Sequence, residues 1–155
     1  MKKGLKNICF FGIIFLIIDQ VIKIVLSDKM VADQSFVVIK DFFSITLVHN
    51  EGAAFSLLTG NRILLISIGI LALVGLIIYI KKLEVIDDFD IFIYSLLLGG
   101  IVGNLIDRII YGYVIDYLSF NFGGYFFPIF NFADICIVVS IVLMIFRTLR
   151  EDLWK

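Results

Sequence analysis

Four long, mainly apolar segments divide this chain, and most polar residues lie between them or at their ends. They cover residues 8–26, 63–80, 90–107 and 131–147. An α-helix of about 20 apolar residues is long enough to cross the hydrocarbon core of a bilayer. The pattern therefore predicts four transmembrane helices. The first segment is too long for a typical signal peptide and has no small-x-small cleavage site after it, which favours a retained helix.

The two longest connections carry a different pattern. In the first, Val37–Ile39 and Phe43–Val48 are rich in β-branched and aromatic residues, and Ser44 and Thr46 alternate with apolar neighbours, which predicts a small pair of strands. The second connection, residues 109–130, is aromatic and contains glycine. It can fold back and bring Asp116 close to Asp134.

Basic residues indicate how the helices are oriented. They gather at the amino terminus, at Lys81-Lys82 and at the carboxyl terminus, all on one side of a four-span arrangement. The positive-inside rule places that side in the cytoplasm, so both termini are expected there. The two long connections then face outward, and the acidic residues beside them lie near the outer surface.

Composition agrees with a membrane protein and narrows the functions to consider. The chain has 155 residues, enough for one domain, and 61% of them are hydrophobic. The net charge of −1 does not suggest a nucleic-acid partner. With a single histidine, His49, the chain cannot form a histidine-based zinc protease site, and we expect no metal or cofactor.

Charged residues inside or beside the apolar segments are the candidates for chemistry, because charge next to hydrocarbon is costly. Asp19 and Lys23 are spaced i, i+4 and can form an ion pair that supports a site. Asp116 and Asp134 can act as a carboxylate pair. Two close carboxylates share a proton, so one can activate water while the other polarises a carbonyl group.

The residues alone leave alternatives open. Asn131 and Asp134 can form a helix cap and nothing more. Arg108 can bind substrate carbonyl groups or neutralise Asp107. A small proton-coupled exporter, with Asp19 or Asp134 carrying the proton, is a competing function. The absence of a repeat and the one-sided placement of the acidic residues count against that exporter.

Five motifs, taken together and in order, resemble bacterial lipoprotein signal peptidase, also called signal peptidase II. They are Asp19-Gln20-x-x-Lys23, Asn50-x-Gly52-Ala53-Ala54-Phe55, Gly103-Asn104-x-x-Asp107-Arg108, Val114-x-Asp116-Tyr117 and Phe130-Asn131-x-Ala133-Asp134. The resemblance covers nearly the whole chain.

This resemblance implies a four-helix aspartic endopeptidase of the bacterial cytoplasmic membrane, with a small β-rich cradle on the extracytoplasmic side. Its substrates would be prolipoproteins modified with diacylglycerol, cut on the amino side of the lipidated cysteine at the outer leaflet. Globomycin-type cyclic peptides would inhibit it. The catalytic pair falls on Asp116 and Asp134. The supporting positions fall on Asp19, Lys23, Asn50, Gly52, Asn104, Asp107, Arg108, Asn131 and Ala133.

Overall fold

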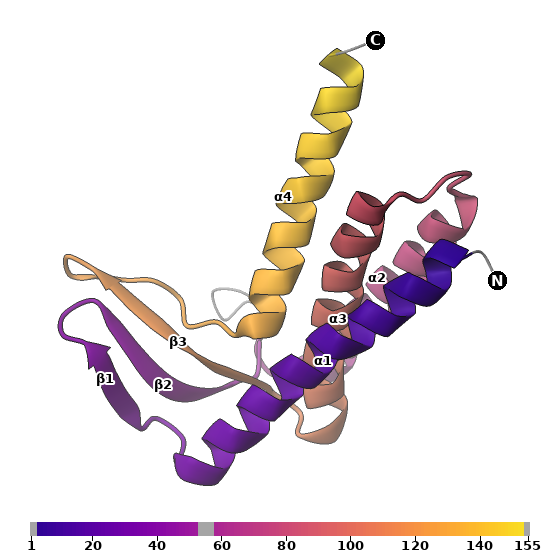
Figure 1. Ribbon diagram of the computed structural model, residues 1–155. Helices are drawn as coiled ribbons and strands as arrows, with labels where there is room; N and C mark the ends of the chain where they lie inside the picture. Colours follow the sequence, from indigo (N-terminus) through magenta and orange to yellow (C-terminus); the bar gives the residue numbers. More distant parts are fainter. Residues whose placement is uncertain (1–2, 53–57, 154–155) are drawn as a thin grey trace.

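Helices and a small sheet form two parts of the molecule in the computed structural model, which describes residues 3–52 and 58–153 (Figure 1). The helices are α1 (Lys3–Lys29), α2 (Arg62–Lys82), α3 (Asp88–Ile110) and α4 (Phe132–Leu153). The strands are β1 (Ser35–Ile39), β2 (Phe43–Asn50), β3 (Val114–Phe122) and β4 (Tyr125–Phe126). Within the described ranges, all four helices are long and apolar enough to cross a membrane.

Helix α3 is the centre of the helical part. In its most apolar window 56% of the residues are buried, against 22% or less in the other three helices. Small residues permit this packing. A Cβ atom on Gly99 would lie 2.7 Å from Phe15 Cβ in α1, and one on Gly100 would lie 2.6 Å from the Ala133 carbonyl oxygen in α4. The glycines therefore let the backbones of α1 and α4 approach α3 closely.

Side-chain caps define where α3 and α4 begin. At the start of α3, the Asp87 carboxylate accepts from the Asp90 backbone N–H, and the Asp90 carboxylate accepts from that of Asp87. Asn131 and Asp134 make the same reciprocal pair at the start of α4. These capping boxes satisfy backbone donors that a helix leaves unpaired in its first turn.

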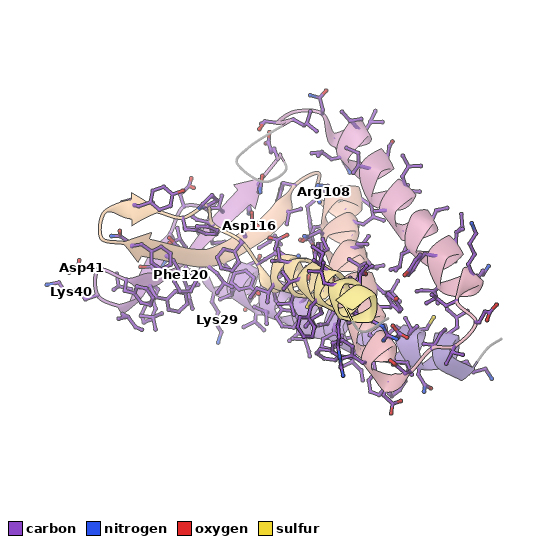
Figure 2. All side chains as sticks on the ribbon, turned by 90° about the horizontal axis from the view of Figure 1, so that it is seen from above. Lys29, Lys40, Asp41, Arg108, Asp116 and Phe120 are labelled. Atoms are coloured by element: carbon purple, nitrogen blue, oxygen red, sulfur yellow. The ribbon has the colours of Figure 1, made fainter. Side chains whose placement is uncertain are left out.

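The four strands form an antiparallel sheet in the order β1-β2-β3-β4, which extends away from the helices. The predicted strand pair is present as β1 and β2, and the second connection supplies β3 and β4. Pairing of β2 with β3 sets Val48 opposite Asp116. Seen from above, Lys40 and Asp41 lie at the far end of the sheet, while Asp116 and Arg108 lie where the sheet meets the helices (Figure 2).

Candidate active site

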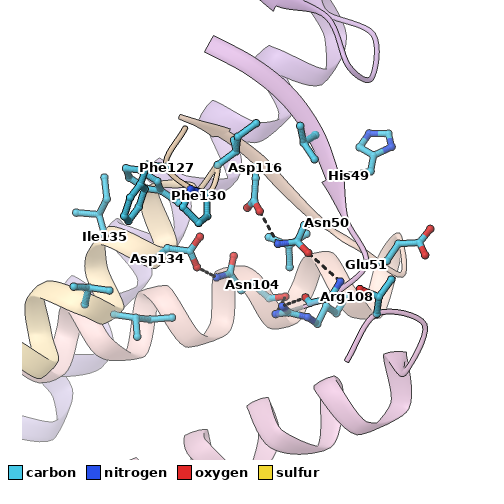
Figure 3. Close-up of a pocket in the computed structure, with 18 of the residues that line it drawn as sticks. His49, Asn50, Glu51, Asn104, Arg108, Asp116, Phe127, Phe130, Asp134 and Ile135 are labelled. Atoms are coloured by element: carbon cyan, nitrogen blue, oxygen red, sulfur yellow. Dashed lines mark hydrogen bonds between the residues drawn. The ribbon is translucent and has the colours of Figure 1, made fainter. Parts of the chain in front are cut away.

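Asp116 and Asp134 line the same cavity, at the junction of the sheet and the helices (Figure 3). The cavity has a volume of about 850 Å³. Strand β3 carries Asp116, and the first turn of α4 carries Asp134. Residues 18 positions apart in sequence thus reach one site because β3 ends in a connection that returns to the start of α4. The apolar part of the lining includes Phe127, Phe130 and Ile135.

Asn131 links the two carboxylates. Its side-chain Nδ2 donates to Asp116 Oδ1 over 2.7 Å, and its backbone N–H donates to Asp134 Oδ2 over 3.1 Å. Its Oδ1 also accepts from the Asp134 backbone N–H at 2.9 Å. The capping arrangement expected as an alternative is therefore present, but it also holds both aspartates together.

Each aspartate has a further amide donor. Asn50 Nδ2 donates to Asp116 Oδ2 over 2.8 Å, and Asn104 Nδ2 donates to Asp134 Oδ1 over 2.7 Å. Burial, followed by the neighbouring negative charge of Asp134, raises the pKa of the Asp116 carboxyl from 3.8 to about 7. The amide donors oppose this shift but do not outweigh it. Asp116 is thus suited to hold a proton near neutral pH.

Arg108 lines the cavity beside the end of β2. Its Nη2 donates to the carbonyl oxygen of Gly52 over 3.0 Å, and Nη1 donates to that of Asn104 over 3.4 Å. Its Nε is buried and has no hydrogen-bond partner among the described residues. Arg108 makes no ion pair with Asp107 in the described part of the chain, because Asp107 is bound by Lys23 instead, at 2.8 Å. Asp107 is therefore paired with Lys23 and not directly with Arg108 in the described residues, and both roles considered for Arg108 stay predictions.

Gly52 connects Arg108 to Asn50. The Gly52 backbone N–H donates to Asn50 Oδ1 over 2.9 Å, so this side chain is fixed at both ends. The rest of this motif, Ala53-Ala54-Phe55, lies outside the described residues.

The remaining predicted supporting residues lie behind the cavity wall. Lys23 forms the predicted ion pair with Asp19 at 2.8 Å, and both side chains are 1% exposed. Asp19 Oδ1 accepts from the backbone N–H of Ala133 over 3.0 Å, which joins α1 to the start of α4. Ala133 is fully buried against α3, where Cβ atoms on Gly100 and Gly103 would lie 2.6 Å from its carbonyl oxygen and 3.4 Å from its Cβ.

Three residues contribute contacts that the sequence did not single out as site residues. Gln20 donates to Asp107 Oδ1 over 2.9 Å. The Tyr117 hydroxyl accepts from the first backbone N–H of α4, on Phe132. Arg62 donates to two carbonyl oxygens at the end of α3. Gln20 and Tyr117 belong to the motifs quoted above, whereas nothing in the sequence around Arg62 marks it.

A second apolar cavity of about 850 Å³ runs between α2, α3 and α4. It shares Asn104, Arg108, Asp134 and Ile137 with the first cavity, so the two meet at Asp134. His49 packs on Tyr113 at 4.0 Å between ring centroids. Among the described residues, no group of histidine, cysteine and acidic side chains is arranged to hold a metal ion.

Known proteins are similar to this chain in sequence or structure over most of its length. The profile of the family described as "Signal peptidase (SPase) II" matches residues 11–150. Lipoprotein signal peptidase of Symbiobacterium thermophilum is 38% identical over 133 residues, 86% of this chain and 88% of the relative. That of Halothermothrix orenii is 40% identical over 140 residues, 90% of this chain and 93% of the relative.

Two solved structures are also similar, and both are described as a bacterial membrane enzyme. The first, at 2.3 Å resolution, has a TM-score of 0.87 and 34% identity, covering 95% of this chain and 90% of its own. The second, at 1.9 Å, has a TM-score of 0.83 and 35% identity, covering 93% of both chains.

Proposed function

The chain belongs to the signal peptidase II family, and we propose that it acts as an aspartic endopeptidase within the membrane. It removes signal peptides from prolipoproteins. The proposed substrate carries diacylglycerol on a cysteine, and the cut falls on the amino side of that cysteine. The observation that carries the proposal is the joint hydrogen bonding of Asp116 and Asp134 by Asn131 in the wall of one cavity.

The two aspartates have different surroundings, which suits them to different roles. Asp134 lies in the first turn of α4, where the helix dipole favours a negative charge, and it accepts hydrogen bonds from Asn104 and Asn131. Asp116 is buried and has a raised pKa of about 7. We infer that Asp134 is ionised and that Asp116 carries the shared proton.

Hydrolysis then needs one water molecule and no covalent intermediate. Asp134 takes a proton from water, whose oxygen attacks the scissile carbonyl carbon, while Asp116 donates its proton to the carbonyl oxygen. The tetrahedral intermediate collapses with breakage of the C–N bond, and the proton held by Asp134 passes to the leaving amine. Asp116 recovers its proton from the intermediate. The products are the signal-peptide carboxylic acid and an amino-terminal lipidated cysteine.

The proposed membrane orientation has the termini and the Lys81-Lys82 loop in the cytoplasm and the sheet at the extracytoplasmic surface of the bacterial cytoplasmic membrane. The described helices support spans near residues 8–26, 63–80, 90–107 and 131–147 within one peptidase domain. In this orientation the catalytic aspartates face the outer leaflet. The apolar cavity between α2, α3 and α4 is suited to an apolar part of the substrate.

The proposed partners follow from the same site. They are lipid-modified prolipoproteins, bilayer lipid and globomycin-type cyclic peptides that compete for the cavity, with no nucleic acid. The amide donors around Asp116 and Asp134 can bind peptide carbonyl groups, and the wall formed by Phe127, Phe130 and Ile135 can bind apolar side chains.

Cleavage of a diacylglyceryl-modified prolipoprotein by the purified protein tests the proposal. We expect activity in the wild type, and its loss in Asp116→Asn and Asp134→Asn variants that remain folded in detergent. Asp41→Asn at the far end of the sheet is the matched control and should retain activity. Substantial activity in either site variant would remove that aspartate from the proposed pair, and an inert wild type would overturn the proposed function.

A further inference from the structure

Behind the cavity wall lies a buried ammonium group with three acceptors. Lys23 Nζ lies 2.8 Å from Asp19 Oδ2, 2.8 Å from Asp107 Oδ2 and 3.1 Å from Asn104 Oδ1. An ammonium group has three N–H donors and no acceptor, so these contacts use all of its hydrogen-bonding capacity. The first two acceptors supply opposite charge. The third is neutral and leads to the proposed catalytic pair.

Lys23 fixes which end of the Asn104 amide faces Asp134. Because Lys23 can only donate, the amide must turn its oxygen toward the ammonium, and its Nδ2 then lies 2.7 Å from Asp134 Oδ1. Asn131 Nδ2 donates to the same Asn104 oxygen over 3.1 Å. The reversed amide would set N–H groups against two donors and its oxygen against a carboxylate.

We propose that Lys23 is a positioning residue of the aspartate pair, which acts by holding Asn104 with its N–H toward Asp134. This inference rests on the proposed function. Lys23 does not line the cavity that contains Asp116 and Asp134, but lines a separate cavity on the other side of the network. Its effect on hydrolysis is therefore indirect. Lys23 ensures that the Asn104 N–H group faces Asp134. This donor favours the ionised form of Asp134, which leaves the shared proton on Asp116.

Several charged and titratable groups face this network, and each belongs to an element packed around it. They are Asp19, Lys23 and Asp28 of α1, His49 of β2, Glu51 after β2, Asp107 and Arg108 of α3, Tyr111 and Tyr113 between α3 and β3, Asp116 and Tyr117 of β3, and Asp134 of α4. A test must therefore separate the orientation of Asn104 from the net charge of the cluster.

The double variant Lys23→Gln/Asp107→Asn makes that separation, since it removes one positive and one negative charge together. A glutamine can present either an oxygen or an N–H to Asn104, so the Asn104 oxygen loses one of the two donors that hold it and keeps only Asn131. We expect kcat for the lipidated substrate to fall at least tenfold with KM changed less than twofold. The acid limb of the kcat–pH profile should move to higher pH. Lys23→Arg retains a donor-only cation and should retain the wild-type profile.

Asn104→Leu provides a second test without a change in net charge. A leucine cannot donate to Asp134, so the pH profile of this variant should shift in the same direction as that of the double variant. Arg147→Gln, which breaks an ion pair with Asp90 at the opposite end of α3, is the control for lost stability. It should lower the melting temperature without moving the pH profile.

The outcomes distinguish this inference from the proposed function. Wild-type activity with an unchanged pH profile in the folded double variant, or in Asn104→Leu, would overturn the positioning role of Lys23 and leave the aspartic mechanism intact. If the double variant fails to fold, Asn104→Leu and Lys23→Arg decide the question. An inert wild type would overturn the proposed function itself.

Discussion

The side-chain amide of Asn131 donates to Asp116 over 2.7 Å, which ties a helix-capping residue to a carboxylate on a neighbouring strand. The same residue caps α4 through Asp134. One asparagine therefore sets the start of a helix and the separation of the two proposed catalytic groups.

Replacement of Asn131 should affect stability and turnover together. In Asn131→Ala, α4 loses its cap and Asp116 loses a donor, so the free energy of unfolding should fall by about 1–2 kcal/mol. Turnover should fall by at least tenfold. Thermal unfolding in detergent and kcat measure the two effects. Asn121→Ala, which removes an amide from the exposed β3–β4 hairpin, should leave kcat unchanged. Equal losses in both variants would contradict the dual role.

The raised pKa of Asp116 predicts the alkaline limb of activity. The pair is active with one proton, and burial together with Asp134 places the pKa of Asp116 at about 7. The kcat for a lipidated prolipoprotein should therefore fall as pH rises through about 7. A flat profile from pH 6 to pH 9 would contradict this assignment.

The same pKa affects stability with a defined sign. Because the folded-state pKa of Asp116 is raised from 3.8 to about 7, its favourable contribution is complete below pH 3.8 and is lost as pH rises through about 7. The melting temperature of Asp116→Asn relative to wild type should therefore increase between these pH values and then level off. A constant difference in melting temperature between Asp116→Asn and wild type across that pH range would argue against a buried, protonated Asp116.

Replacement of a glycine by alanine should lower stability in α3 and raise it in α2. In Gly100→Ala the new Cβ would lie 2.6 Å from the Ala133 carbonyl oxygen, so α4 must move away from α3 and Asp134 must move with it. We expect lower stability and at least a tenfold loss of kcat. In Gly75→Ala nothing described lies within 4 Å of the new Cβ, and helix propensity should raise stability by up to about 1 kcal/mol. Melting temperature and kcat of both variants test this.

Arg108→Lys should separate the charge of Arg108 from its geometry. A lysine retains the positive charge but cannot reproduce the fixed fork that donates to Gly52 and Asn104. Gly52, just after β2, should be held less firmly, with a several-fold higher KM for the lipidated substrate. Initial-rate kinetics measure this KM. An unchanged KM would show that charge alone is sufficient.

The hydrophobic pattern and the motifs predicted much of this molecule. Four apolar helices, the strand pair after α1 and the family are confirmed, because span length and motif spacing are local properties of the chain. The pairing of β3 with β2 was not predicted from the residues. It depends on contacts between segments about 70 residues apart, which no local pattern encodes.

The partners of individual side chains were harder to predict. The i, i+4 spacing was sufficient for Asp19 and Lys23, which lie on one helix. It gave no indication that Lys23 also binds Asp107, so the direct pairing of Arg108 with Asp107 remained open. Arg62 and its contacts at the end of α3 likewise arise only when two helices pack together.

Helix α2 packs only loosely against the rest of the protein, since only Leu65, Leu76 and Ile80 are buried along its length. In the proposed membrane orientation, the α2 side chains outside the cavity between α2, α3 and α4 face lipid, which accepts any apolar side chain of suitable length. Natural and laboratory sequences should therefore drift freely at these positions while α3 stays almost fixed. A library that randomises these α2 positions among apolar residues would yield many working enzymes, and the same library in α3 very few. The catalytic apparatus thus occupies a narrow strip of the chain, beside a helix that lines a cavity with one face and tolerates change on the other.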